Sequence, residues 1–242
     1  MYFFSKYFIY SKNFYVSLLF LLPMLFLYEV LCFLHYSHKD YQLRNSADVF
    51  IKNIFNNNNP SINIFLTFIL ITLFLWLIYH NYKILFKNGI NLSYLLLMIL
   101  ESIFWSFTLI ILMQRFDILL LQIFRQDSIS NQLYLAIGAG IWEEILFRVI
   151  LIYISMKFFT ILLKFKKINS IICSLLLSSL LFSLFHYMGD MGDVITLNSF
   201  LLRGFAGLIL ATIYVNRGFG ITAYTHIFYD VIIISFPVLI ES

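Results

Sequence analysis

Long runs of apolar residues alternate with short polar segments along most of this sequence. Seven runs are long enough to form α-helices that cross the hydrocarbon core of a bilayer, which is roughly 30 Å thick. Polar backbone groups inside a bilayer must be paired within the chain, and a helix pairs them within itself. The pattern therefore predicts an all-α, polytopic transmembrane helix bundle of about seven spans, at residues 14–34, 62–78, 92–113, 133–156, 169–186, 199–215 and 219–240.

Two longer polar segments separate these runs. Residues 35–61 carry mixed charges and four consecutive asparagines before Pro60, which predicts a solvated loop. Residues 114–131 alternate apolar residues with charged ones, which predicts an amphipathic helix along the membrane interface. No soluble domain is left between the runs, so residues 1–242 are expected to form a single integral membrane domain.

Composition and charge agree with this interpretation. Hydrophobic residues make up 62% of the chain and charged residues only 12%, whereas soluble domains are near half apolar and a quarter charged. The net charge is +4, and the basic residues are spread between the apolar runs rather than gathered in a stripe, so nucleic acid is not an expected partner. Cys32 and Cys173 both lie inside apolar runs and are expected to be small packed side chains rather than nucleophiles or disulfide partners.

The distribution of lysine and arginine predicts the orientation. The loop after the fourth run holds Lys157, Lys164, Lys166 and Lys167, and such basic loops face the cytoplasm. Alternation of the spans then places the N-terminus in the cytoplasm. Because no cleavage site of small residues follows the first run, we expect it to be retained as a span.

The fourth run contains two adjacent acids and an arginine, Glu143, Glu144 and Arg148. An ionisable side chain in mid-bilayer costs roughly 2.5 to 3.5 kcal/mol, so each needs a partner or a purpose. Glu144 and Arg148 are four residues apart and share a helix face, which predicts an ion pair. Glu143 points about 100° away in an α-helix, so its carboxylate is free for another partner.

Two further motifs place histidines in later runs. Phe182 and His186 are spaced to stack on one face of the fifth helix, and His226 and Asp230 share one face of the seventh. Each motif alone is also compatible with an architectural salt bridge or a histidine satisfied at a helix end. Isolated buried charges are costly, so we expect these residues to converge in one cavity formed by the fourth, fifth and seventh helices.

The three motifs, in this order, resemble the CPBP family of membrane-embedded proteins, which includes CAAX proteases and bacteriocin-processing or Abi proteins. The family's motifs read Glu-Glu-x-x-x-Arg, Phe-x-x-x-His and His-x-x-x-Asn/Asp, and the resemblance covers residues 136–235. It implies an intramembrane endopeptidase with its protease core at residues 133–240. The best-studied members carry Asn at the last motif position, where this chain has Asp230; an acid there must be protonated or act as an acceptor.

Hydrolysis of an amide needs an activated water, stabilisation of the oxyanion and a proton for the leaving amine. Glu143 and His186 can hold and deprotonate water, while His226 can stabilise the oxyanion with Asp230 orienting its ring. By resemblance, these residues and Glu144 are catalytic, with Arg148 and Phe182 in support. The resemblance leaves open a divalent metal such as zinc, on Glu143, His186 and His226, or a metal-free glutamate mechanism. His186 can meet His226 only if the fifth helix continues past it, through residues 187–189.

Alternatives from other classes remain open at this level. A non-catalytic membrane immunity or scaffold protein would share the fold, and a proton-coupled transporter also uses acid–histidine chains. The expected partners of a protease are membrane lipid and a membrane-associated peptide or protein substrate. The composition suggests a bacterial plasma membrane, with peptide processing or bacteriocin self-immunity as the context. Glu29 and Glu101 are interpreted first as packing or hydrogen-bonding acids, with a place in the lining of the cavity as the alternative. Arg203 lies near a helix start and can snorkel or pair with Asp190 or Asp193.

Overall fold

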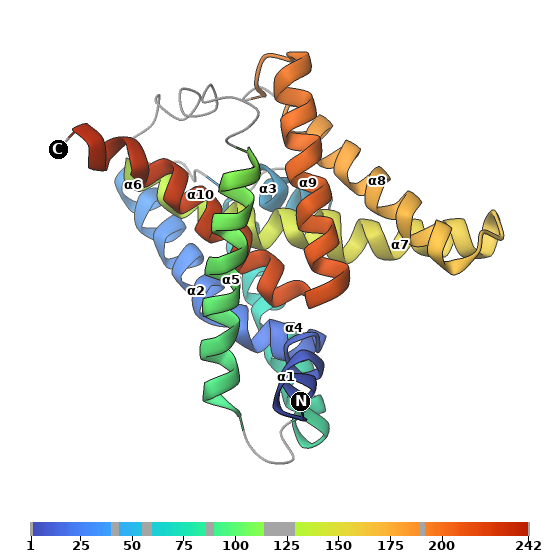
Figure 1. Ribbon diagram of the computed structural model, residues 1–242. Coiled ribbons are helices and arrows are strands. Elements are labelled where there is room, and N and C mark those ends of the chain that lie inside the picture. Colours follow the sequence, from blue (N-terminus) through green and yellow to red (C-terminus); the bar gives the residue numbers. More distant parts are fainter. Residues whose placement is uncertain are drawn as a thin grey trace.

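The computed structural model describes residues 2–39, 44–54, 60–85, 90–113, 129–188 and 192–241, and every regular element in these ranges is helical (Figure 1). The elements before the fourth predicted span are α1 (Tyr2–Ser11), α2 (Phe14–Lys39), α3 (Ser46–Asn53), α4 (Pro60–Leu85) and α5 (Leu92–Met113). They are followed by α6 (Ile129–Gly138), η2 (Ala139–Leu151), α7 (Ile152–Lys157), η3 (Phe158–Leu162), α8 (Lys167–Phe185), α9 (Leu197–Arg217) and α10 (Phe219–Glu241).

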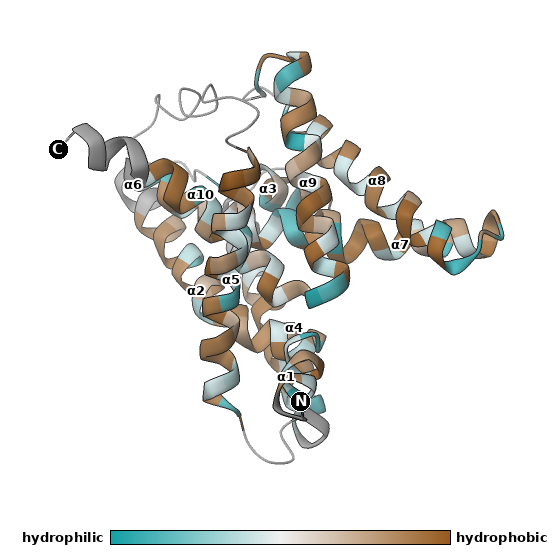
Figure 2. Cartoon of the chain, viewed as in Figure 1, coloured by the Kyte–Doolittle hydropathy of each residue, from teal (hydrophilic) through white to brown (hydrophobic). Residues whose placement is uncertain are grey.

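All seven predicted spans correspond to helices. By length and composition, α2, α5, the helix Asn131–Leu162, α8 and α9 can each cross a membrane. Shorter apolar stretches lie in α4 and α10, at Leu66–Tyr82 and Phe219–Ser235. Hydrophobic residues recur along the helices, as the brown segments of the ribbon in Figure 2 show. The prediction of an all-α integral membrane protein is confirmed.

Helix α5 exposes large apolar side chains on its outer face. Large apolar side chains spaced three or four residues apart project outward and are more than half exposed: Leu92, Leu96, Leu100, Phe104, Phe107 and Ile111. The opposite face is buried and includes Ser102 and Ser106, which donate hydrogen bonds to backbone carbonyls. Such an arrangement suits a helix with lipid on one side, because lipid accepts apolar side chains and small residues let helices approach each other.

Helix α8 follows the same rule with a buried row of serines, at Ser170, Ser174, Ser178, Ser179 and Ser183. The Ser178 hydroxyl donates to the Phe147 carbonyl on η2 at 2.9 Å, and Ser183 donates to the Phe200 carbonyl on α9 at 2.7 Å. These bonds hold α8 against both neighbours, and Figure 1 shows α8 and α9 side by side. The serine row therefore fixes the end of α8 that carries the second motif.

The fourth span is not a uniform α-helix. Its central 13 residues, Ala139–Leu151, form a π-helix, in which each N–H bonds to the carbonyl five residues back. This segment carries Glu143, Glu144 and Arg148, all buried. The sequence did not predict the π-helix, because an apolar run is compatible with an α-helix and with a π-helix.

Helix α10 packs against η2 at a glycine. A Cβ on Gly140 would lie 2.3 Å from the Ile227 side chain and 2.8 Å from the Ala223 carbonyl oxygen. Only a residue without a side chain permits this approach. The contact brings the first and third motifs together, because His226 adjoins Ile227 and Gly140 precedes Glu143 by less than one turn.

Two expectations about the connections were wrong. The segment predicted as a solvated loop, residues 35–61, contains the end of α2 and the helix α3, in which Ala47, Asp48 and Lys52 are buried. Asn45 caps α3 by accepting a hydrogen bond from the Ala47 N–H, and the charged side chains Asp48 and Lys52 pair with each other. Helix α8 does not continue past His186, since it ends at Phe185 and turns.

Two further expectations concern the cysteines and the segment 114–131. Within the described part of the chain no disulfide joins Cys32 and Cys173, and Cys32 is fully buried while Cys173 is partly buried. The predicted amphipathic helix at residues 114–131 falls largely outside the described residues.

Candidate active site

Glu144 and Arg148 form the predicted ion pair at the centre of the site. Arg148 Nε lies 3.1 Å from Glu144 Oε2, and both side chains are fully buried. Arg148 also donates from Nη2 to the Gly207 carbonyl at 3.3 Å, and its guanidinium lies 4.4 Å from the centre of the Phe182 ring. The arginine thus ties η2 to α8 and α9.

His226 on α10 is held between two carboxylates. Its Nδ1 lies 2.7 Å from Glu144 Oε1, and its Nε2 lies 3.5 Å from Asp230 Oδ2. The sequence predicted Asp230 as the orienting residue, but the shorter contact comes from Glu144 on the other helix. Glu144 therefore bridges Arg148 and His226, with one oxygen for each.

Glu143 faces a different set of partners, as its position next to Glu144 predicted. Its Oε1 accepts a hydrogen bond from Asn45 Nδ2 at 2.9 Å, while its Oε2 lies 4.0 Å from His186 Nε2. This Oε2 is buried and has no hydrogen-bond partner among the described residues. The carboxylate thus has one oxygen fixed and one oxygen directed at an imidazole.

His186 caps α8 and folds back over its last turn. Its Nδ1 lies 2.8 Å from the Phe182 carbonyl, and its ring lies edge-on to the Phe182 ring at 4.8 Å. Because a carbonyl oxygen only accepts, Nδ1 carries a proton. When the ring is neutral, its Nε2 therefore presents a lone pair toward Glu143. The Phe182 ring also lies 6.0 Å from that of His226, so it is the apolar partner that the two histidines share.

The structure thus brings together all seven residues that the motifs singled out: Glu143, Glu144, Arg148, Phe182, His186, His226 and Asp230. They come from η2, α8 and α10, as expected. His186 reaches Glu143 although α8 does not continue, because the ring turns back along the helix instead of projecting beyond it.

Sequence reasoning missed Asn45. It lies in the segment predicted to be a solvated loop, about a hundred residues before Glu143, and no local pattern connects the two. An asparagine followed by an acid in the first turn is an N-cap signal that indicates the start of α3. That signal concerns α3 alone and gives no indication of the contact with Glu143.

A group of paired charged side chains on α2, α3 and the residue before Asn45 surrounds the segment that carries Asn45. Arg44 pairs with Glu29 at 2.8 Å and with Asp48 at 2.7 Å, and Lys52 pairs with Asp48 at 2.7 Å. Tyr28 donates to Asp48 at 3.0 Å and accepts from the Asn45 backbone N–H at 3.0 Å. The two acids and two bases balance, which reduces the cost of burying them.

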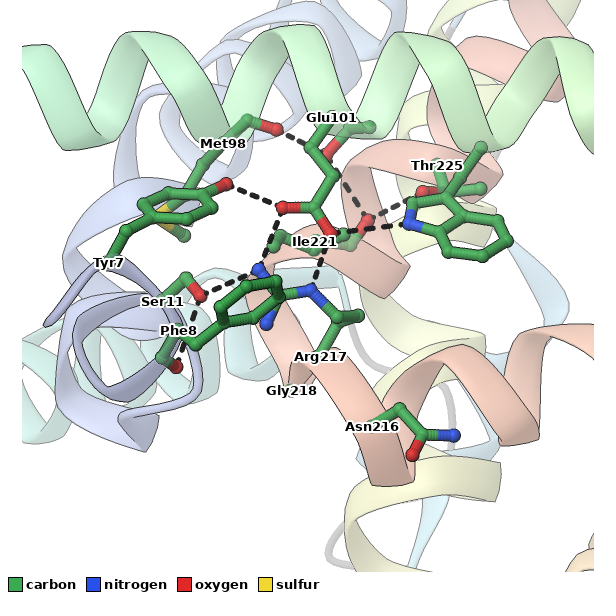
Figure 3. A network of polar contacts seen from close by, with 12 residues as sticks. Tyr7, Phe8, Ser11, Met98, Glu101, Asn216, Arg217, Gly218, Ile221 and Thr225 are labelled. Atoms are coloured by element: carbon green, nitrogen blue, oxygen red, sulfur yellow. Dashed lines mark hydrogen bonds and ion pairs between the residues drawn. The ribbon is translucent and has the colours of Figure 1, made fainter. Parts of the chain in front are cut away.

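Glu101, a partly buried acid on α5, belongs to a separate network (Figure 3). Arg217 at the end of α9 pairs with both of its oxygens, Tyr7 on α1 donates to it at 2.5 Å, and Trp105 donates at 3.2 Å. Glu101 therefore fastens α1 and α9 to α5, as a packing acid would. Arg203 pairs with Asp193, one of the two partners foreseen for it; the other, Asp190, lies outside the described residues.

The side chains do not fit the three-ligand metal centre left open by the sequence. Within the described residues, no three histidine, cysteine, aspartate or glutamate side chains are grouped as metal ligands.

Residues 125–232 match the family model of type II CAAX prenyl endopeptidase Rce1-like proteins. The matched segment contains all three motifs and excludes α1 to α5. Comparisons with curated proteins and with solved structures gave no match.

Proposed function

We propose that this chain, whose C-terminal half belongs to the Rce1-like CAAX protease family, hydrolyses a peptide bond in a membrane-associated peptide or protein. The observation that carries the proposal is the free oxygen of Glu143, which faces the lone pair of His186 at 4.0 Å. Two groups at a distance beyond a direct hydrogen bond are commonly joined by one water molecule.

Both of these groups accept hydrogen bonds, which determines how such a water is oriented. Its two protons point to Glu143 Oε2 and His186 Nε2, so its lone pairs point outward to a substrate carbonyl. Glu143 takes a proton as the water attacks and later returns it to the leaving amine. A positioned base of this kind contributes about 10² to 10⁴ in rate.

His226 is the candidate for oxyanion stabilisation. In the protonated form of the ring, Nδ1–H donates to Glu144 and Nε2–H, on the side of Asp230, is the second donor. Arg148 holds Glu144 and thereby the ring, so the donor is fixed before the charge develops. A preorganised donor of this type is worth about 10² to 10³ in rate.

The location of these residues supports a membrane-associated substrate. Glu143, Glu144 and Arg148 lie in the helix Asn131–Leu162, and His226 and Asp230 lie in the apolar stretch Phe219–Ser235. His186 directly follows the apolar helix α8. A peptide that reaches them must enter between apolar helices, and a bacterial peptide precursor or a membrane-anchored protein meets that requirement.

Reconstitution of the purified protein in liposomes tests the proposal. The liposomes are loaded with membrane peptides, and new peptide termini are identified by mass spectrometry. We expect termini that appear with the wild-type protein and are absent with Glu143→Gln, which keeps the shape of the side chain but removes the base. The same termini from both proteins would overturn the proposal.

A further inference from the structure

Asn45 is bound at both ends of its side chain. Its Oδ1 accepts from the Ala47 N–H at 2.9 Å and starts α3, and its Nδ2 donates to Glu143 Oε1 at 2.9 Å. An N-cap needs only the oxygen, and Ser, Thr or Asp would serve that role as well. The amide nitrogen is therefore the part of Asn45 that capping does not explain.

The segment that carries Asn45 is unusually well fixed for a connection between two helices. The Asn45 backbone N–H donates to Tyr28, and its neighbour Arg44 pairs with Glu29 and Asp48. Asp48 and Lys52, fully buried in the next turns, lock α3 in place. A donor anchored in this way can hold a carboxylate in one orientation.

We infer that Asn45 is a positioning residue for the catalytic base, and that it selects which oxygen of Glu143 does the chemistry. By occupying Oε1, it leaves Oε2 as the oxygen that faces His186. Without this bond the carboxylate can rotate about its last torsion, and the two acceptors no longer hold a water between them.

The inference rests on the proposed function but goes beyond it. Asn45 lies outside residues 125–232, so the segment matched by the family model does not include it. The active site of this chain would then be completed by a residue from its N-terminal part, which links α2 and α3 to the chemistry on η2 and α8.

Three variants separate positioning from capping. Asn45→Asp keeps the shape and the capping oxygen but replaces the donor with an acceptor. Asn45→Ser keeps a capping oxygen and adds no charge. Asn216→Asp is the matched control, because Asn216 is exposed and its amide only reaches the Thr212 carbonyl on its own helix.

The first measurement is the kinetics of cleavage, kcat and KM, on a membrane peptide that the wild-type protein has been found to cleave. We expect kcat to fall about tenfold to a hundredfold in Asn45→Asp and Asn45→Ser, the size of effect caused by small displacements of catalytic groups. KM should change little, and Asn216→Asp should match the wild type. Wild-type kcat in both Asn45 variants, while Glu143→Gln is inactive, would overturn the inference and leave the proposed function standing.

Thermal stability supplies a measurement that does not depend on cleavage. In the double variant Asn45→Asp with Glu143→Gln, the new glutamine amide can donate to the new aspartate, which restores the bond with reversed polarity. We expect the double variant to melt above Asn45→Asp alone. Additive effects of the two substitutions would show that the side chains do not contact each other and would overturn the inference. No cleavage by the wild-type protein would instead overturn the proposed function, and the positioning role of Asn45 with it.

Discussion

Glu144 on η2 accepts a hydrogen bond from His226 on α10 across 2.7 Å, and its other oxygen pairs with Arg148. The two motifs that supply these residues are about eighty positions apart in the chain. Their contact joins η2 to α10 through a fully buried carboxylate. The two adjacent glutamates therefore have different roles. Glu144 holds the structure of the site, and Glu143 keeps an oxygen free for chemistry.

Removal of Arg148 tests this division. Arg148→Ala leaves the buried Glu144 carboxylate without its cation, which should cost roughly 3 to 5 kcal/mol of stability. Glu143→Gln keeps the shape of the side chain and should leave folding intact. Thermal unfolding in detergent compares the two variants, and equal melting temperatures would contradict the structural role given to the ion pair.

Replacement of Asp230 tests the second neighbour of His226. Asp230→Asn keeps an oxygen that can accept from His226 Nε2 and adds an amide that can donate to an oxyanion. We expect this variant to keep most of its cleavage rate. Asp230→Leu, of similar size but apolar, should be clearly slower; equal rates in the two variants would show that the polar contact is not used.

The close approach of η2 and α10 depends on Gly140. An alanine there would force its Cβ into Ile227 and the Ala223 carbonyl, and overpacking of this kind costs about 1 to 3 kcal/mol. Gly140→Ala should lower both the melting temperature and the cleavage rate. Gly204→Ala on α9 is the control, because its Cβ would meet nothing nearer than Ser183 at 4.0 Å. Similar behaviour of the two variants would argue against the tight helix crossing.

The network of Glu101 and Arg217 should affect stability without affecting chemistry (Figure 3). Arg217→Ala leaves Glu101 without its cation, and hydrogen bonds to charged groups contribute roughly 1.5 to 3 kcal/mol. We expect a lower melting temperature but an unchanged cleavage rate per folded molecule. A selective loss of rate with normal stability would place Glu101 in the active site.

The spans and the motif residues could be predicted from the sequence because each depends on local spacing. Apolar runs of membrane length gave the helices, and the four-residue spacing of Glu144 and Arg148 gave their ion pair. The fixed order of the three motifs indicated the family resemblance, and residues 125–232, which contain all three, match the Rce1-like family model.

Contacts between distant segments could not be predicted in this way. The bond from Asn45 to Glu143, the bond from His226 to Glu144 and the pairing of Arg217 with Glu101 each depend on how helices cross. Helix α3 was missed because its charged residues resemble a solvated loop until their partners, Glu29 and Arg44, are known. The approach at Gly140 likewise becomes visible only when α10 is in place.

The most direct test of the account is the rate at which the purified, folded protein cleaves a membrane-associated peptide when Glu143 or His186 is changed to alanine. We expect each variant to lose about 10² to 10⁴ in rate while its melting temperature shows a folded protein, and the wild-type rate to persist in a chelator. Full activity of well-folded Glu143→Ala would contradict the account and favour a non-catalytic membrane scaffold.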